Sequence, residues 1–210
     1  PQAMPISTPI LTLNKQPIVR RSFLLGMTSA MVAGPAFALD KATATQLVDR
    51  LVAEINRVIN SGGSEGKLIR AFENIFAQYA DVDIIARSAL GPAARSASSS
   101  ELNAFSRAFR GYIARKYGKQ FQEFIGSSIV VTRTKNRGKF FEVEASVRLK
   151  GTTPFEVSFR VSDRSGENLF FDIIIEGISL LSSERVEIGA LLDARNGNIA
   201  RMTRDLVNQG

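Results

Sequence analysis

The fold is decided by one stretch, Lys139–Leu180, which has the sequence KFFEVEASVRLKGTTPFEVSFRVSDRSGENLFFDIIIEGISL. It contains three segments in which apolar residues alternate with other residues: Phe140–Leu149, Phe155–Val161 and Leu169–Ile175. Because successive side chains of a strand point to opposite sides, each segment predicts a β-strand with one apolar face. Their short connections favour antiparallel neighbours. The stretch therefore predicts a sheet with a Phe-rich face that either helices or a ligand must cover.

A fourth strand is predicted at Ile129–Thr134, with a hairpin turn at Lys135–Gly138. On both sides of the strands, apolar residues recur at helical spacing. The predicted helices are Lys41–Ile59, Glu65–Gln78, a short helix around 84–90, Ser98 to about Gln122, Ser182–Ala194 and Ile199–Val207. Ser98 and Glu101 have the spacing of a capping box. This order predicts an α+β fold, in which helices cover one face of a curved, four-stranded antiparallel meander and enclose an apolar cleft.

The first 38 residues predict an export signal. Arg20 and Arg21 precede an uncharged apolar stretch, and Ala36–Ala38 has the small-x-small pattern of a cleavage site. The sequence around the two arginines is similar to the twin-arginine signal, with the general secretory route as the alternative. We expect export with cleavage near Ala38, which leaves a single α+β domain at 39–210. An uncleaved segment that anchors the N-terminus is the other interpretation.

The composition excludes several kinds of site. The chain has no Cys and no His, which excludes disulfides, Cys–His or Ser–His nucleophilic sites, and metal binding by these residues. An all-carboxylate metal site or a Lys-based site stays open. The net charge is +7, and removal of the predicted signal, with its three basic residues and no acidic one, lowers it to about +4. This charge is too small to predict nucleic-acid binding.

Three features bear on chemistry or ligand binding. Asp172 lies in an otherwise apolar strand, and because a buried carboxylate needs a partner, we expect a structural hydrogen bond to a backbone or Arg group. Glu142 and Glu144 alternate with apolar residues, so we expect them on a solvated face. Twelve Phe residues remain after the predicted signal. They indicate either an aromatic core or a cavity wall for a long apolar ligand, and composition does not decide between the two.

Two blocks of sequence resemble a known protein family. The first, residues 85–109, contains I-A-R-S-A-L-G, then Arg95, then S-x-x-E-L-x-x-F-x-x-x-F. The second, residues 171–180, is FDIIIEGISL and is followed by Arg185. In this order, over about Leu47–Leu206, the chain resembles the MlaC-type (toluene-tolerance) periplasmic phospholipid-binding proteins. The resemblance implies a soluble periplasmic carrier that holds acyl chains between sheet and helices, leaves the head group near solvent, catalyses no reaction and needs no cofactor.

The resemblance also implies partners. These are phospholipid, an outer-membrane lipoprotein complex, and an inner-membrane MCE-domain protein with an ABC transporter, in retrograde transport that maintains outer-membrane lipid asymmetry. We expect a monomer with no nucleic-acid partner. One alternative is an enzyme of the ketosteroid-isomerase kind on a similar cone-shaped α+β scaffold, with Asp172 or Tyr112 as base or donor. A structural or adaptor protein with a filled core is the second alternative.

Strand alternation and the implied cleft together predict the residues that line it. The predicted sheet side consists of Phe141, Val143, Val147, Phe155, Val157, Phe159, Phe171 and Ile173. The predicted helix side consists of Phe105, Phe109 and Tyr112. For each of these residues, packing in a core without a cavity is the alternative.

Overall fold

In the computed structural model, which describes residues 39–209, helices and strands follow each other in the predicted order. The predicted export signal and its cleavage site lie outside the described residues. The helices are α1 (Lys41–Ser61), α2 (Glu65–Tyr79), α3 (Val82–Leu90), α4 (Ser99–Gly118), α5 (Leu180–Asp193) and α6 (Ile199–Leu206), with 3-10 helices at Gly91–Arg95 and Lys119–Phe124. The strands are β1 (Ser128–Asn136), β2 (Phe141–Arg148), β3 (Phe155–Ser162), β4 (Leu169–Ile175) and β5 (Ile178–Ser179). The predicted α+β class is confirmed.

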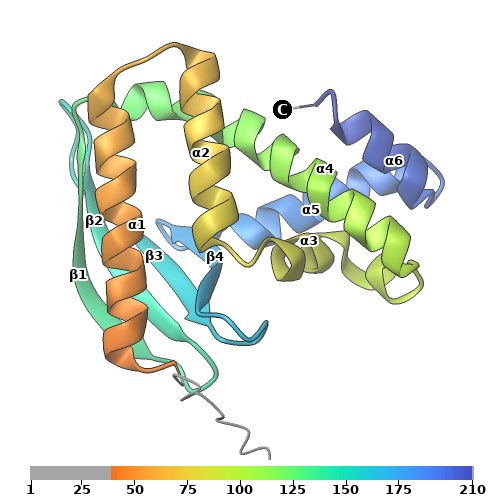
Figure 1. The fold of residues 1–210 in the computed structure, drawn as a ribbon, viewed down its shortest axis with the longest axis horizontal. Helices are drawn as coiled ribbons and strands as arrows, with labels where there is room; N and C mark the ends of the chain where they lie inside the picture. Colours follow the sequence, from red (N-terminus) through yellow and green to blue (C-terminus); the bar gives the residue numbers. More distant parts are fainter. Residues whose placement is uncertain (1–38, 210) are drawn as a thin grey trace, which may run out of the picture. The chain divides into compact units, whose positions relative to one another are not determined.

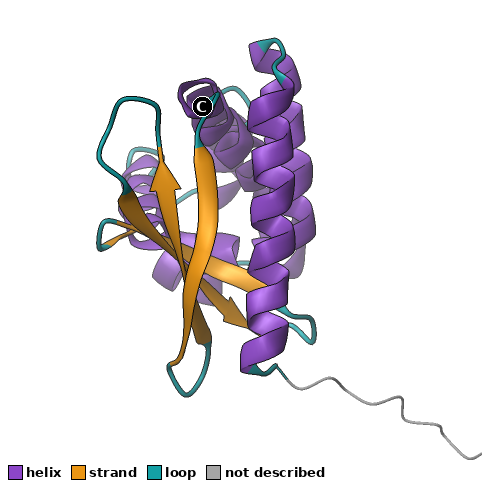
Figure 2. Ribbon diagram, turned by 90° about the vertical axis from the view of Figure 1, so that its left-hand side faces the viewer, coloured by secondary structure: helices purple, strands orange, loops and turns teal. Residues whose placement is uncertain are grey.

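The strands form one antiparallel sheet in the order β1-β2-β3-β4-β5. The predicted four-strand meander is present, and the two-residue β5, which was not predicted, adds a fifth strand to it. Helix α1 lies along one face of the sheet (Figures 1 and 2). Helix α2 packs beside α1, and α3 and α5 pack near β4 at the other side (Figure 1). The helices therefore cover the face on which the apolar side chains gather.

Alternation in β2 and β3 places their apolar residues on this covered face. Val143 pairs with Phe159, and Ala145 pairs with Val157. All four are buried, with exposed fractions of at most 7%. The predicted apolar face of these two strands is therefore confirmed.

A bulge changes the pattern in β4. Arg160 pairs with Asp172, but its neighbour Val161 pairs with Phe170, so Phe171 has no partner in the register. Phe170 is buried, and its ring contacts those of Phe76 and Phe159. Alternation over Leu169–Ile175 predicts that Leu169, Phe171, Ile173 and Ile175 share one face, and this prediction is wrong at the bulge. Phe170 takes the core position there, while Phe171 is half-buried with its ring edge-on to Phe140.

The ends of α4 follow from local chemistry. The Ser98 hydroxyl accepts a hydrogen bond from the backbone N–H of Glu101, whose carboxylate accepts one from the Ser98 N–H, so the predicted capping box is confirmed. The helix ends at Gly118, before the predicted end near Gln122. A Cβ at Gly118 would lie 2.8 Å from Cα of Ile69, so glycine permits the close approach of α4 to α2. The chain then continues in the 3-10 helix.

Side chains of α1 protect the outer edge of β1. The side chain of Asn56 accepts a hydrogen bond from the Ile129 N–H (3.1 Å) and donates one to the Ile129 carbonyl (2.9 Å). This amide thus satisfies the backbone groups of Ile129 that face away from β2. Nearer the start of α1, the hydroxyls of Thr45 and Thr134 are hydrogen-bonded. At Ile129, the Asn56 amide takes the place of a further strand, which an open edge would invite.

Part of the outer face of the sheet is an ion-pair network instead of the solvated surface predicted for Glu142 and Glu144. Glu144 is 5% exposed and forms ion pairs with Lys135 and with Arg133, whose Nε donates to Oε2 at 2.8 Å. Glu142 is paired with Arg137. The prediction that Glu144 is solvated is therefore wrong. Alternation predicts the face of the sheet on which a side chain lies. Whether cations bury that side chain depends on the residues of the neighbouring strand, here Arg133 and Lys135 of β1.

We expect acid to weaken the protein through Glu144. The hydrogen bond from Lys135, together with Arg133, lowers the pKa of this carboxyl below its ordinary value of 4.5, although burial opposes the shift. A carboxyl with a lowered folded pKa stabilises the protein above its unfolded pKa, and this stabilisation is lost as pH falls through the folded pKa. The variant E144Q lacks the titrating group. Its free energy of unfolding should fall less than that of the wild type between about pH 6 and about pH 3 in urea titrations.

The matched control is E156Q, because Glu156 is an exposed glutamate on the adjacent strand β3. It should follow the wild-type pH dependence. An E144Q protein that loses as much stability in acid as the wild type contradicts the assignment to Glu144.

Candidate functional site

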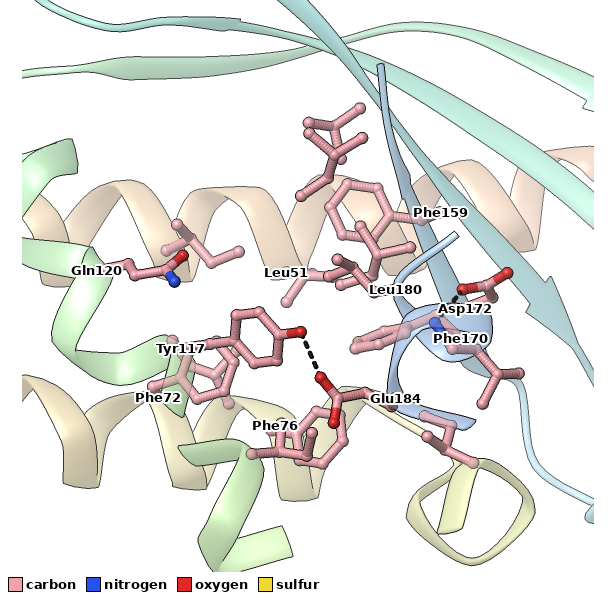
Figure 3. A pocket seen from close by; sticks show the side chains of 18 of the residues that line it. Leu51, Phe72, Phe76, Tyr117, Gln120, Phe159, Phe170, Asp172, Leu180 and Glu184 are labelled. Carbon is pink, nitrogen blue, oxygen red and sulfur yellow. Dashed lines mark hydrogen bonds between the residues drawn. The ribbon is translucent and has the colours of Figure 1, made fainter. Parts of the chain in front are cut away.

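An apolar cavity of about 180 Å³ lies between the covered face of the sheet and the helices. Twenty of its 24 lining residues are apolar. The strands contribute Ile129, Val147, Phe155, Val157, Phe159, Phe170, Phe171, Asp172, Ile173 and Ile175. The helices contribute Leu51, Ile55, Phe72, Ile75, Phe76, Ile85, Phe109, Ile113, Tyr117, Gln120, Phe124, Leu180, Leu181 and Glu184. Figure 3 shows rings from several of these elements facing one another across the space.

Seven of the eleven predicted lining residues border this cavity. They are Phe109, Val147, Phe155, Val157, Phe159, Phe171 and Ile173. On the sheet side they belong to three adjacent strands, β2, β3 and β4, because register places their apolar residues next to one another. The structure thus brings together most of the residues that alternation predicted for the sheet side.

The other four predicted residues lie elsewhere. Val143 is fully buried, and its partner in β1 is Thr134, whose hydroxyl is hydrogen-bonded to Thr45 of α1. Phe141, two residues earlier in β2, is half-buried. Phe105 is fully buried against Phe109 within the helices. Tyr112 packs its ring on Phe109, but its hydroxyl donates to Glu187. Each of the four helps to fill the core instead of bordering the cavity.

Sequence reasoning missed most of the helix side of the cavity. Leu51 and Ile55 of α1 border it, as do Phe72, Ile75 and Phe76 of α2. All five belong to apolar stripes that had predicted the helices themselves. These stripes were the available signal, but they do not show which helix faces the sheet.

Asp172 is held by three hydrogen-bond donors. Its Oδ2 accepts from Arg160 Nη1 (3.2 Å) and from the Ser179 hydroxyl (2.8 Å), and its Oδ1 accepts from the Leu181 N–H (3.1 Å). The prediction of a structural hydrogen bond to an Arg and to the backbone is confirmed. Because the donors come from β3, β5 and α5, the carboxylate fixes where α5 begins beside the cavity.

A second polar group reaches the cavity from α5. Glu184 is 2% exposed, and its Oε1 accepts hydrogen bonds from Lys116 Nζ (2.7 Å) and from the Tyr117 hydroxyl (2.5 Å) of α4. Figure 3 shows the Tyr117–Glu184 hydrogen bond between the lining rings. Lys116 also binds Glu187, which accepts from Tyr112. Lys116 and its two glutamates thus form an ion-pair cluster that joins α4 to α5.

The charges in this cluster are stabilised by its own contacts. Burial disfavours the charged form of Lys116, but hydrogen bonds to Glu184 and Glu187 outweigh it and raise its pKa. Burial and the hydrogen bond to Glu184 raise the pKa of Tyr117, so its hydroxyl stays a donor. For Glu187, burial is opposed by the hydrogen bonds from Lys116 and Tyr112, which together lower its pKa.

Neither a metal-binding cluster nor a membrane span is found in the described part of the chain. Among residues 39–209, no three potential metal-ligating side chains come together. None of the helices there is both long and apolar enough to cross a membrane.

Comparisons with known proteins point to one family. The family model described as MlaC protein matches residues 45–208. A solved phospholipid-binding protein from Ralstonia solanacearum, in complex with a phospholipid, has a similar fold with a TM-score of 0.67 and 16% sequence identity. The similarity covers 78% of this chain and 94% of the Ralstonia chain. No curated protein sequence matches the chain.

Proposed function

Since the chain belongs to the MlaC protein family, we propose that it is a phospholipid-binding protein whose apolar cavity holds the acyl chains. The observation that carries the proposal is the cavity, with 20 apolar residues around it, between sheet and helices. The solved relative with a similar fold was determined with a phospholipid bound, which supports this ligand class. The proposed acyl-chain contacts from the sheet include Val147, Phe155, Val157 and Phe159.

The physical chemistry of the cavity suits an acyl chain. Each methylene that leaves water contributes about 0.8 kcal/mol, so even part of one chain supplies substantial affinity. The present volume of about 180 Å³ lies below the ~300–1,000 Å³ of typical ligand pockets. A diacyl lipid therefore requires the wall to move outward. Several lining residues are only half-buried, among them Ile55, Phe72 and Leu181, and these are the side chains best placed to move.

We further propose the cellular role that the family implies. A monomer exported to the periplasm, with residues 1–38 as its signal, takes lipid from an outer-membrane lipoprotein complex. It delivers this lipid to an inner-membrane MCE-domain protein with an ABC transporter, and it needs no cofactor. Because an apolar ligand leaves such a cavity only at high cost, transfer needs a partner that favours the open state or offers a competing apolar site.

The geometry favours binding over catalysis. The alternative enzyme requires Asp172 or Tyr112 to act as base or donor toward a bound substrate. The Asp172 carboxylate is already engaged by three donors, and the Tyr112 hydroxyl is engaged by Glu187 and lies outside the cavity lining. Neither group is placed for proton transfer to a ligand in the cavity.

Mass spectrometry of lipids extracted from gently purified protein tests the proposal. We expect phospholipid in stoichiometric amounts, and native mass spectrometry of the same sample should show it bound to the folded chain. Protein that carries no phospholipid after purification, and takes none up from vesicles, contradicts the proposed function.

A further inference from the structure

The cavity has an open end and a closed end. Along β3, exposure falls from the half-buried Phe155 through Val157 to Phe159, which is 4% exposed, and all three border the cavity. Gln120 is an exposed residue of the lining, and it lies on the opposite side of the space from Phe170 (Figure 3). The cavity therefore opens toward Phe155 and Gln120 and ends at Phe159 and Phe170.

Three aromatic rings form the closed end. The ring centroid of Phe170 lies 6.0 Å from that of Phe159 in β3 and 6.2 Å from that of Phe76 in α2. The three rings together thus span the gap between the sheet and the helices. Behind them, Val161, the partner of Phe170, and Val143, the partner of Phe159, are fully buried and do not border the cavity. The space therefore ends at the rings, and packed core follows.

Backbone contacts hold this closed end in place. The Asp81 N–H donates to the Phe170 carbonyl at 2.8 Å, and Ala80, which follows α2, forms a parallel β-bridge with Phe170. The two layers are thus joined directly at the rings. At the sides of the cavity, by contrast, Ile55 and Phe72 are only half-buried. A ligand can widen the cavity by moving these side chains, whereas the depth of the cavity is fixed at Phe170.

We propose that Phe76 and Phe170 set the length of the acyl chain that the cavity accepts. This inference rests on the proposed function. The acyl chain enters at the open end, because its polar head group must stay in water, and its methyl end reaches the rings. Methylenes beyond that length have no apolar surroundings to enter and stay at the open end. The rings thus determine the preferred chain length for any head group.

This arrangement has a measurable signature in the affinity. Each methylene that moves from water into the cavity should tighten binding about fourfold. Once the methyl end meets the rings, a further methylene should change the affinity by less than about twofold. The logarithm of the affinity, plotted against chain length, should therefore rise and then show a break. Since the volume of about 180 Å³ only slightly exceeds that of an apolar cavity of ~150 Å³ that accepts benzene, the break should come before about 16 carbons.

The test measures by calorimetry the binding of monoacyl phospholipids that share one head group and have saturated chains of about 6 to about 16 carbons, below the concentrations at which they form micelles. Purified protein is first stripped of lipid, and circular dichroism verifies that it is still folded. F76A should move the break to chains about three carbons longer, fewer than the ring atoms removed, because neighbouring side chains relax into part of the space. The milder variant F76L should move it by about one carbon.

F140A is the matched control. Phe140 also belongs to a ring pair, with Phe171, but it does not border the cavity. Its replacement should leave the break at the chain length found for the wild type.

Two outcomes overturn the inference. One is a wild-type affinity that rises by the same factor up to the longest chain, which decides the matter even if neither variant of Phe76 folds. The other is a break at the wild-type length in a folded F76A protein. Binding without a break leaves the proposed function standing. If the wild type binds none of the chains, the proposed function fails, and this inference fails with it.

Discussion

Replacement of Asp172 by Ala is expected to lower the free energy of unfolding by about 3 kcal/mol, because a hydrogen bond to a charged group contributes about 1.5–3 kcal/mol and this buried carboxylate accepts three of them. The side chain of Asp172 is 2% exposed and accepts three hydrogen bonds. Its loss leaves the Leu181 N–H and the Arg160 guanidinium without this acceptor. Because these donors lie on different elements, D172A also loosens the junction between β4 and the start of α5. The midpoint of urea unfolding measures the effect.

Two variants sharpen the test. D172N keeps the size of the side chain and one carbonyl acceptor but not the charge, so its loss should be smaller than that of D172A. D193A removes an exposed carboxylate at the end of α5 and should change stability by no more than about 0.5 kcal/mol. A D172A protein within about 1 kcal/mol of the wild type contradicts a structural role for the buried carboxylate.

Strand alternation predicted the sheet well because it depends only on neighbouring residues. It located β2 and β3 and the apolar face that they share. It failed where geometry between strands intervenes. The bulge opposite Arg160 places Phe170, not Phe171, in the core, and nothing local in the sequence of β4 announces it. Glu144 shows the same limit, since its cations come from the neighbouring strand.

The lining of the candidate site was likewise predictable only in part. Its sheet side follows from alternation, whereas its helix side depends on how α1 and α2 rotate toward the sheet, which helical stripes alone do not fix. The two blocks that carry the family resemblance do come together. A Cβ at Gly91, in the first block, would lie 3.4 Å from Nε of Arg185, which follows the second block. The two blocks of the family resemblance thus include residues that pack together where α3 meets α5. Helical or strand periodicity does not predict this contact.

The second large effect concerns the ligand: replacement of Phe72 by Glu is expected to reduce co-purified phospholipid at least tenfold. Phe72 borders the cavity from α2, and its ring stacks on that of Phe76 (Figure 3). A carboxylate at this place would have to lose its water when acyl chains bind, and this cost exceeds the ~1.4 kcal/mol that corresponds to a tenfold loss. Because Phe72 is only half-buried and Glu is a good helix former, the free protein should still fold.

The matched control is N74E, since Asn74 lies two residues further along α2 and is exposed. It introduces the same charge into the same helix without reaching the cavity, so it should retain lipid like the wild type. Circular dichroism verifies that both variants are folded, and lipid phosphorus per protein chain gives the occupancy. Since the two variants differ in the side of α2 that carries the charge, a lipid loss in F72E alone places the acyl chains in this cavity. Equal occupancy in F72E and N74E contradicts that placement and requires the lipid to bind on another surface.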